Sequence, residues 1–322
     1  DECSIADDVW VSPIGDNNND GTSESEAFLT INRALEMIAP DNDNQITITI
    51  TDGTFSPSIT GETYPIFMTS NVNLVGLGEG ITILDAEQTS RVITIDNLEA
   101  VVISDLSVIN GLADTYYPYN CGGGIFIDHS DVELNNLIIG DNHANTKGGG
   151  VFLKYSNSTM NSIVIKENSA DYWGGGMYLD HSDPIIDDIT IIDNKCIHSD
   201  GINGVGGGIS TIYSNPIINN VNIINNQSYL MGGGVYLFNS NPVMNNILVQ
   251  GNQSASGGGL FLYGSSPSLS HGRIIENRAD QENGGGIDLF STNQNYGSYP
   301  TLTDITIADN TSTKKGGGIN LY

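Results

Sequence analysis

Hydrophobic and polar residues alternate along most of this chain, and the alternation recurs with a fixed period of about 26 residues. Each period opens with three glycines and an apolar-x-apolar stretch, as in "GGGIFI" and "GGGVFL". A small polar corner such as "SNP" follows, and a second alternating stretch closes on aliphatic-x-x-Asn. The triplets begin at Gly122, Gly148, Gly174, Gly206, Gly232, Gly257, Gly284 and Gly316. Two of the intervals are longer by about six residues, which indicates insertions into an otherwise regular repeat.

Alternation with a period of two predicts β-strands, and no part of the repeat has helical spacing. Three short strands cannot bury an apolar face alone, so successive units must stack into a solenoid filled by Ile and Val. Neighbouring coils are then ~4.8 Å apart, and residues at the same position in each repeat form columns along the rod. We expect the closing asparagines to form a structural ladder that satisfies buried polar groups of the turns. Its members are Asn142, Asn168, Asn194, Asn226, Asn252, Asn277 and Asn310.

The N-terminal third has a different pattern. Phe28, Ile31, Leu35 and Ile38 have helical spacing within residues 27–39, and Pro40 is expected to end that helix. A helix at this place would cap the open edge of the first coil. We therefore divide one continuous β-helix domain (1–322) into an N-terminal strand and capping helix (1–45), irregular coils (46–121) and triplet-led coils (122–322), the last of them incomplete.

The pairing of GGG[IVLM] with IxxN resembles the GGA[IVL] and FxxN repeats of the polymorphic outer-membrane protein family, with aliphatic residues in place of Phe. Residues 9–110, which contain "VNLVGLGEGITILDA" and "VVISDLSVING", resemble the N-terminal region of secreted bacterial right-handed parallel β-helix repeat proteins. The resemblance covers nearly the whole chain and implies an all-β fold, a right-handed three-sided parallel β-helix. It implies little about activity, because this fold carries adhesins, lyases and hydrolases alike.

The charge of the chain limits its partners. Ten Lys and Arg residues stand against 38 acidic residues, and a net charge of −28 excludes nucleic acid and anionic membranes as partners. No apolar run approaches the ~20 residues of a membrane helix, so we expect no direct membrane insertion. The polar, Lys-poor composition favours an extracellular or cell-surface location, with a signal peptide already removed. Of the cysteines Cys3, Cys121 and Cys196, the last two would be about 14 Å apart in a regular stack, beyond disulfide reach.

One short motif suggests a metal. Asp16, Asn18 and Asp20 precede a glycine in the spacing D-x-N-x-D-G, which is the first half of a calcium loop. The twelfth position of such a loop is Ala27 here, and Glu26 lies one place short of the expected ligand. The alternative is a turn rich in Asn, Asp and Gly before the capping helix. Ca²⁺ is the cofactor that this motif would imply.

A row of rings follows the first strand of the repeats. Phe126 lies between the inward-facing Ile125 and Ile127 and must therefore point outward. Its column consists of Phe126, Phe152, Tyr178, Tyr236 and Phe261, and Tyr155, Tyr213, Phe238, Tyr263 and Phe290 lie near the same edge. An exposed row of this length could stack on sugars or dock against another protein. The alternative is that the rings contact one another and stabilise the stacked coils.

Acidic residues cluster near the same corner. They are Asp128 and Asp131 with His129, then Asp180 and Asp183 with His181, followed by Asp187 and Asp188. Paired carboxylates could catalyse hydrolysis or hold calcium for a polysaccharide lyase. However, Asp128 and Asp180 obey the repeat two coils apart, about 10 Å, whereas a catalytic cluster should break it. The candidate bases Lys154, Lys166 and Arg273 have no evident constellation around them, so we interpret the acidic residues as solvated turn residues.

The leading hypothesis is therefore a non-catalytic structural or adhesive rod. Its expected partners are other copies of itself, packed end to end or laterally, or glycans and proteins of a cell surface. The closing "GGGINLY" motivates end-to-end packing, because an exposed strand edge invites pairing. Two alternatives stay open. The first is a polysaccharide lyase or glycoside hydrolase acting on an acidic polysaccharide, with residues 195–205 or 291–300 shaping a groove. The second is a carbohydrate-binding module that uses the outward aromatic row.

Overall fold

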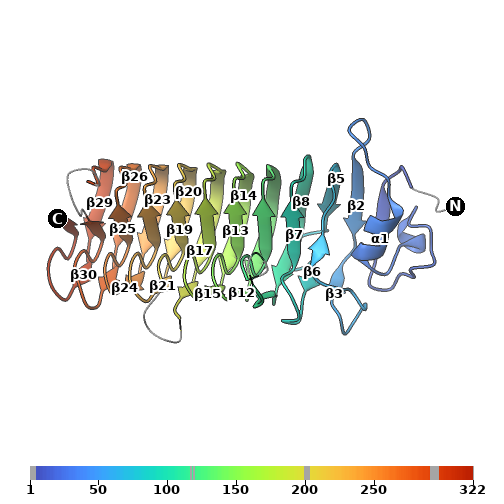
Figure 1. Ribbon diagram of the computed structural model, residues 1–322, viewed down its shortest axis with the longest axis horizontal. Helices are drawn as coiled ribbons and strands as arrows, with labels where there is room; N and C mark the ends of the chain where they lie inside the picture. Colours follow the sequence, from blue (N-terminus) through green and yellow to red (C-terminus); the bar gives the residue numbers. More distant parts are fainter. Residues whose placement is uncertain (1–4, 117, 119, 199–203, 291–296, 322) are drawn as a thin grey trace.

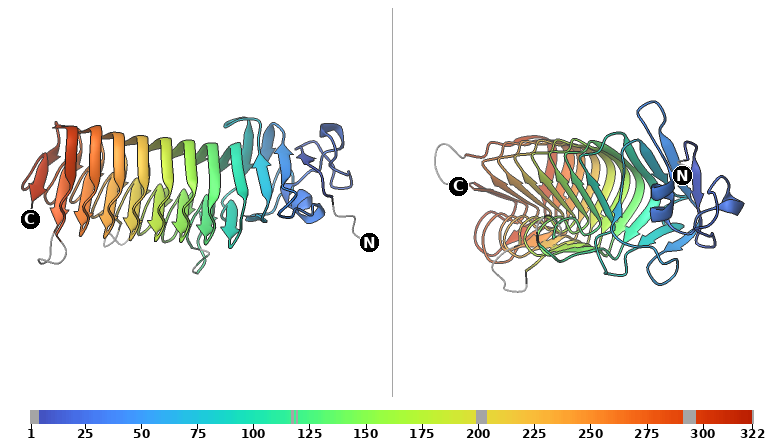
Figure 2. Two further views of the ribbon diagram at one scale, coloured as in Figure 1. Left: turned by 90° about the horizontal axis from the view of Figure 1, so that it is seen from above. Right: turned by 45° about the vertical axis from the view of Figure 1, so that its right-hand side comes forward.

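The computed structural model describes residues 5–116, 118, 120–198, 204–290 and 297–321 of the chain. In this described part the strands form three parallel sheets, which run along an elongated rod with the N-terminal segment at one end (Figure 1). The chain passes from sheet to sheet and returns to the first after each turn, so the architecture is a three-sided parallel β-helix. Figure 2 shows the coils stacked one behind another along the long axis.

Each sheet collects strands from successive coils, and the third sheet begins only at the coil that contains β8 and β9. The first contains β1 (Val9–Val11), β2 (Ile46–Ile50), β5 (Val72–Val75), β8 (Val101–Ile109), β11 (Val132–Gly140), β14 (Thr159–Lys166), β17 (Ile185–Ile192), β20 (Ile217–Ile224), β23 (Val243–Gln250), β26 (Ser268–Ile275) and β29 (Thr301–Ala308), joined by β3 (Gly53–Phe55) and β6 (Thr82–Asp85). The second contains β4 (Ile66–Phe67), β7 (Ile93–Asp96), β10 (Ile125–Asp128), β13 (Val151–Lys154), β16 (Met177–Asp180), β19 (Ile209–Ile212), β22 (Val235–Phe238), β25 (Leu260–Tyr263), β28 (Ile287–Phe290) and β31 (Ile319–Leu321). The third contains β9 (Leu112–Ala113), β12 (His143–Ala144), β15 (Ser169–Ala170), β18 (Lys195–Cys196), β21 (Gln227–Ser228), β24 (Gln253–Ser254), β27 (Arg278–Ala279) and β30 (Thr311–Ser312).

The register of the sheets shows that one sequence repeat is one coil. In the second sheet, Ile125 pairs with Val151, and Val151 pairs with Met177. Side chains of these columns are buried and form one continuous apolar core along the rod. Because apolar residues at the same position stack on each other in every coil, the core needs only a repeated pattern and no unique packing arrangement.

The long strands of the first sheet turn a corner in their middle. Leu134 and Leu137 both face the core although they are three residues apart, which a straight strand with its period of two does not allow. Asn136 between them has φ of 51°, a left-handed conformation that asparagine tolerates better than most residues. The first sheet therefore has two faces that meet at an angle, and the left-handed column at the bend carries exposed polar side chains.

The glycine triplets make the corner before the second sheet. Gly122 has φ of 63°, which favours glycine. A Cβ atom on Gly123 would lie 2.6 Å from the carbonyl oxygen of Gly149 in the next coil, and one on Gly124 would lie 2.6 Å from that of Gly150. The triplet is needed because the first glycine has a left-handed backbone, while the backbones of the second and third approach the neighbouring coil too closely for any side chain.

The capping helix exists but is shorter than the spacing of apolar residues predicts. Helix α1 spans Ile31–Met37, after a 3₁₀ turn η1 at Glu24–Glu26. Phe28 is buried but lies outside the helix, in an extended segment that pairs with Val11. The hydroxyl of Thr30 accepts a hydrogen bond from the backbone N–H of Arg33, so Thr30 is the N-cap and fixes the start of the helix.

A buried carboxylate attaches α1 to the first coils. Glu62 is 1% exposed, and its oxygens accept hydrogen bonds from the backbone N–H groups of Ile31 (2.6 Å) and Asn32 (3.3 Å). A negative charge is favourable at this position, because the first N–H groups of a helix have no partner within it. Burial nevertheless raises the pKa of Glu62, while these hydrogen bonds oppose the shift. Within the described residues, no helix is long and apolar enough to cross a membrane.

Candidate functional site

The predicted outward row of rings lies under a second layer of the chain, which corrects the expectation that it is exposed. Phe126, Phe152, Tyr178 and Phe261 are at most 2% exposed, and Tyr236 is partly buried. The rings of Phe126 and Phe152 stack at 5.1 Å, and those of Phe152 and Tyr178 at 5.5 Å. We call these five residues the covered ring row. Ser210 separates Tyr178 from Tyr236, and on each side of it the rings contact one another, which is the structural alternative that the sequence left open.

The cover comes from the residues just before each glycine triplet. Cys121, Lys147 and Trp173 pair with one another in successive coils, and the covered ring row packs against them as a second apolar cluster. Lys147 Nζ lies 4.9 Å from the ring centre of Trp173 and donates a hydrogen bond to the Tyr178 hydroxyl (3.2 Å). The guanidinium of Arg91 lies 4.4 Å above Phe126. Cations therefore lie over the rings of Phe126 and Tyr178, which present no open face to a sugar in this structure.

A second row of rings is exposed three residues further along each coil. It consists of His129, Tyr155, His181 and Tyr213, which all have left-handed backbones. Tyr155 and Tyr213 are 46% and 48% exposed. Ring centres are 4.8 Å apart from His129 to Tyr155 and 5.1 Å apart at each of the next two steps. We call this set the exposed ring row. Because Tyr155 and His181 each lie between two other rings of the row, they present their edges and polar atoms outward rather than a free face.

The acidic residues beside this row lie against its histidines. Nδ1 of His129 lies 2.7 Å from Asp128, and Nδ1 of His181 lies 2.7 Å from Asp180. Lys154 occupies the position between the two aspartates in the column. Burial raises the pKa of the Asp128 carboxyl, against the opposing effect of the Lys154 charge. The carboxylates of Asp128 and Asp180 are therefore separated by a cation, whereas Asp96 is the ladder neighbour of Asp128 on the other side.

The other acidic residues of the predicted clusters also serve as acceptors between coils. Asp187 accepts a hydrogen bond from Asn220 (2.7 Å), and Asp188 accepts one from the hydroxyl of Ser162 (3.0 Å). An outer ladder runs along the corner, in which each side chain accepts a hydrogen bond from the backbone N–H of its successor. Its members are Asp131, Asn157, Asp183, Asn215 and Asn241.

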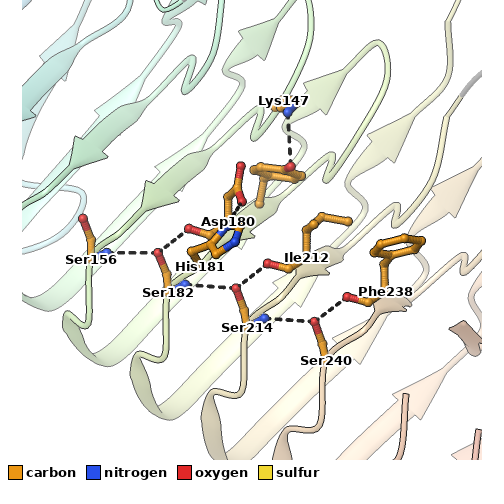
Figure 3. Close-up of polar contacts among 10 residues, drawn as sticks. Lys147, Ser156, Asp180, His181, Ser182, Ile212, Ser214, Phe238 and Ser240 are labelled. Carbon is orange, nitrogen blue, oxygen red and sulfur yellow. Dashed lines mark hydrogen bonds and ion pairs between the residues drawn. The ribbon is translucent and has the colours of Figure 1, made fainter. Parts of the chain in front are cut away.

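Two further ladders are buried. Figure 3 shows the serine ladder, in which the backbone N–H of Ser182 donates to the hydroxyl of Ser214 (3.0 Å), while that hydroxyl donates to the carbonyl of Ile212 (2.9 Å). In the asparagine ladder, the backbone N–H and the amide of Asn194 both donate to Oδ1 of Asn226 at 3.0 Å. The same pattern joins Asn142, Asn168, Asn194, Asn226, Asn252, Asn277 and Asn310.

The predicted calcium residues form turns in this structure. Oδ1 of Asp16 accepts hydrogen bonds from the backbone N–H (2.9 Å) and the amide (2.8 Å) of Asn18. Asp20 accepts them from the backbone N–H and the hydroxyl of Thr22, and these bonds lower its pKa. Within the described residues, no group of three or more His, Cys, Asp or Glu side chains is arranged to hold a metal ion. Calcium binding here stays a prediction.

Of the cysteines, Cys121 packs with the covered ring row, and Cys196 lies on β18 in the third sheet. Cys121 and Cys196 are free, buried thiols whose pKa values are raised by burial, and Cys3 lies outside the described residues. The loops 195–205 and 291–300, which were predicted to shape a groove, lie partly outside the described residues as well. Of the candidate bases, Lys166 lies on β14 with Gly140 and Ile192 as its ladder neighbours.

The family of the chain follows from its sequence. Residues 58–271, more than half of the chain, match the family described as the right handed beta helix region. The chain belongs to the right-handed β-helix family. The predicted right-handed, three-sided β-helix with a helix at its N-terminal end is thereby confirmed. Residues 304–321 also match the Chlamydia polymorphic membrane protein repeat, the family that the GGG and IxxN pattern resembles.

Solved structures of the right-handed β-helix fold show the same architecture at low sequence identity. Pectate lyase Pel9A is 11% identical, with a TM-score of 0.58 over 100% of this chain and 82% of the lyase chain. A pectin methylesterase in complex with a hexasaccharide is 12% identical, with a TM-score of 0.52 over 82% of this chain and 89% of that chain. At such identities the likeness concerns the fold alone. No curated protein sequence is similar enough to this chain to count as a match.

This β-helix departs from its own repeat on β26. Other coils have an aliphatic residue facing the core after the bend, such as Val221 and Ile247, but the residue there on β26 is Gly272. His271 precedes it at the bend, and Arg273 follows it on the outer surface. These residues line an open groove of about 580 Å³ that runs along the angle between the two faces of the first sheet. The sequence analysis missed it, although "SHGR" in place of the more common "NN" and aliphatic residue was a visible signal.

Proposed function

We propose that this chain is a non-catalytic structural β-solenoid, located outside the cell or at its surface, which acts as a rigid rod in adhesion or assembly. The observation that carries the proposal is that side chains able to perform acid-base chemistry are used to join coils. Asp128 and Asp180 bond to histidines of the exposed ring row, and Asp131 and Asp183 belong to the outer ladder. A catalytic carboxylate needs a free oxygen that faces substrate, and these positions do not favour one.

Rigidity follows from the number of independent connections between coils. Besides the backbone bonds of three sheets, adjacent coils share the asparagine ladder, the serine ladder, the outer ladder and stacked rings. Each buried amide of the ladder is hydrogen-bonded at both its oxygen and its nitrogen, so bending the rod would leave buried polar groups unpaired. Such a rod is suited to projecting or spacing other groups.

The surface location has two supports. The repeat matched by residues 304–321 is named for a membrane protein family, and a net charge of −28 favours solubility and repulsion from anionic lipids. We infer that the rod is displayed outside the cell and does not insert into a membrane. Other copies of the chain, or glycans and proteins of a cell surface, are its proposed partners.

A turnover assay tests the absence of catalysis. The purified chain is incubated with pectin, polygalacturonate, alginate and neutral β-glucans, with and without Ca²⁺. Unsaturated products are followed by ultraviolet absorbance and new reducing ends by a colorimetric assay. We expect neither signal above that of a heat-denatured sample. Turnover of any of these polymers would overturn the proposal.

Sedimentation velocity and electron microscopy test assembly. A self-associating rod gives species longer than one chain as the concentration rises from micromolar to near millimolar. Strictly monomeric particles over this range would eliminate self-association and leave glycans or other proteins as the partners.

A polysaccharide-active enzyme is the second candidate. It is favoured by the groove at β26, where Nε2 of His271 lies 3.6 Å from Asp304 and Arg273 is adjacent. If the turnover assay gives a product, the variants His271→Ala and Asp304→Asn identify whether this groove is responsible. Full activity in both variants would exclude it.

A further inference from the structure

The groove at β26 has the features of a binding site rather than a gap in packing. Its walls are the left-handed column at the bend and the outward-facing column that follows. It crosses the coils of β17, β20, β23, β26 and β29, a length of about 19 Å at the usual spacing between strands. At its centre, a Cβ atom on Gly272 would lie 2.7 Å from Cγ1 and from the carbonyl oxygen of Ile247, so the glycine lets β26 approach the preceding coil closely and no side chain rises from this position into the groove.

Arg273 supplies the positive charge of this groove. Its ladder neighbours are Leu248 and Thr306, and no hydrogen bond or ion pair joins its guanidinium to another residue in the described part of the chain. In a chain with ten basic and 38 acidic residues, an unpaired arginine between an aliphatic residue and a threonine is unusual. The planar guanidinium can bind both oxygens of a carboxylate at once.

Neutral polar groups continue the groove on one side of Arg273. The amide nitrogen of Asn246 donates to Oδ1 of Asn220 (2.7 Å), and that of Asn222 donates to Thr190 (3.5 Å). Within the described residues, this leaves the Oδ1 atoms of Asn222 and Asn246 without a donor. Hydroxyl groups of a ligand are suitable donors for such acceptors, and the Thr306 hydroxyl offers a further contact.

The charge at the ends of the groove limits how acidic the ligand can be. Asp188 lies at one end and Asp304 at the other, and the whole chain carries a net charge of −28. A polymer with a charge on every unit would place carboxylates next to both aspartates, and the overall field would oppose its approach. A mostly neutral ligand with one acidic group avoids this repulsion.

We propose that this groove binds an extended, largely neutral oligosaccharide that carries one acidic unit, with the acidic group on Arg273 and hydroxyl groups on Asn222 and Asn246. An extended peptide fits less well, because the lining offers amides and a hydroxyl but no deep apolar pocket for side chains. The inference goes beyond the proposed rod function, since it gives the rod a ligand without requiring cleavage.

Calorimetric titration with three matched probes tests the proposal. The probes are a xylotriose that carries one methylglucuronic acid, neutral xylotetraose and tetragalacturonic acid. We expect the singly acidic probe to bind about tenfold more tightly than xylotetraose, the usual effect of a hydrogen bond to a charged group. Tetragalacturonic acid, with four carboxylates, is expected to bind more weakly than the singly acidic probe.

Arg273→Gln is the decisive variant, and Arg278→Gln is its matched control. Arg278 lies on β27, outside the groove, and pairs with Asp280. The Arg273→Gln variant should lose the tenfold preference while binding xylotetraose as the wild type does, and Arg278→Gln should keep the preference. Circular dichroism verifies that both variants are folded.

Several outcomes would overturn the proposal. They are absence of binding of the singly acidic probe at millimolar concentration, retention of the preference in Arg273→Gln, its equal loss in Arg278→Gln, or tighter binding of tetragalacturonic acid. Mass spectrometry of the titrated probes detects cleavage products, so the test of binding is kept separate from the test of the proposed rod function. Cleavage products would eliminate the non-catalytic rod but not the binding site, whereas failure to bind would eliminate the site and leave the rod.

Discussion

The covered ring row and the exposed ring row run side by side along this rod, three residues apart in each coil, yet they differ in what lies over them. Phe152 is 1% exposed beneath the segment that precedes the next glycine triplet, whereas Tyr155 is 46% exposed. Both rings contact neighbours at similar distances, 5.5 Å from Phe152 to Tyr178 (stacked) and 5.1 Å from Tyr155 to His181 (tilted). Ring contact is therefore common to the two rows, and burial is the difference that should decide their contributions to stability.

The largest expected effect is the difference in stability between a variant of the covered ring row and a variant of the exposed ring row. Phe152→Ala should lower the free energy of unfolding by about 3–5 kcal/mol, because it removes a buried ring and leaves a cavity under Lys147 and Trp173. Tyr155→Ala should cost less than about 1 kcal/mol, since its ring contacts are made at the surface. Urea denaturation followed by circular dichroism measures both variants.

Equal losses in the two variants would contradict the interpretation that burial, rather than stacking, makes the covered row important. Phe152→Leu is the control for a general effect of substitution at this site. It keeps most of the apolar volume and should retain most of the stability.

The second prediction applies the same contrast to the polar ladders. Asn226→Ala should cost about 3 kcal/mol, because it removes the acceptor of two buried donors on Asn194 and leaves them unpaired. Asn215→Ala in the outer ladder should cost less than about 1 kcal/mol, since water can replace its exposed partner. The midpoints of thermal unfolding compare the two, and a similar fall for both would show that exposure does not matter.

The third prediction concerns the cover itself. Lys147→Met keeps the length of the side chain but removes the cation above Trp173 and Tyr178 and its hydrogen bond to the Tyr178 hydroxyl. We expect a loss of about 1 kcal/mol, the usual size of a partly exposed cation–π contact. Lys314→Met is the matched control, because Lys314 pairs with Glu282 at the surface and should change stability little. If both variants behave alike in urea denaturation, the cation contributes nothing specific to the covered row.

The smallest expected effect concerns Glu62, the buried carboxylate that joins the capping helix to the first coils. Burial raises the pKa of Glu62 in the folded protein above that in the unfolded chain, so the protonated form is favoured on folding. This contribution to stability is present at low pH and is lost as the pH rises through the folded pKa. The thermal midpoint of the wild type should therefore fall relative to that of Glu62→Gln between about pH 4 and pH 7. A constant difference between the thermal midpoints of the two proteins over this pH range would show that the protonation of Glu62 does not contribute to stability.

The sequence was sufficient for the fold because each coil repeats the same inward residues. The columns of Ile125 and Asn142 are visible as a periodic pattern, and their burial follows from stacking alone. The helix was located correctly, but its start depended on the Thr30 cap rather than on the apolar spacing that includes Phe28. Alternation shows which side chains leave the core, but it does not show whether another segment covers them.

The candidate site illustrates the same limit. The rings of the covered row were predicted to face outward, and they do leave the core, but Lys147 and Trp173 belong to segments with no repeated residue type that would mark them as a cover. The groove at β26 depends on three departures from the repeat, His271, Gly272 and Arg273, that gain meaning only when the bend of the first sheet places them together. Periodicity therefore predicts what the coils share and is uninformative about what makes one coil different.

The ladders also determine how this molecule can change in evolution. Asn168 and Asn194 are 26 residues apart, whereas Asn194 and Asn226 are 32 residues apart. In both pairs, Oδ1 of the second residue accepts a hydrogen bond from the amide nitrogen of the first at 3.0 Å. An interval that is longer by six residues thus leaves the ladder contact between coils unchanged. Duplication of one whole period would lengthen the rod by about 4.8 Å and restore every ladder contact, whereas a loss of part of a period would not. Length and surface chemistry can consequently be varied independently, one by copying coils and the other by enlarging loops.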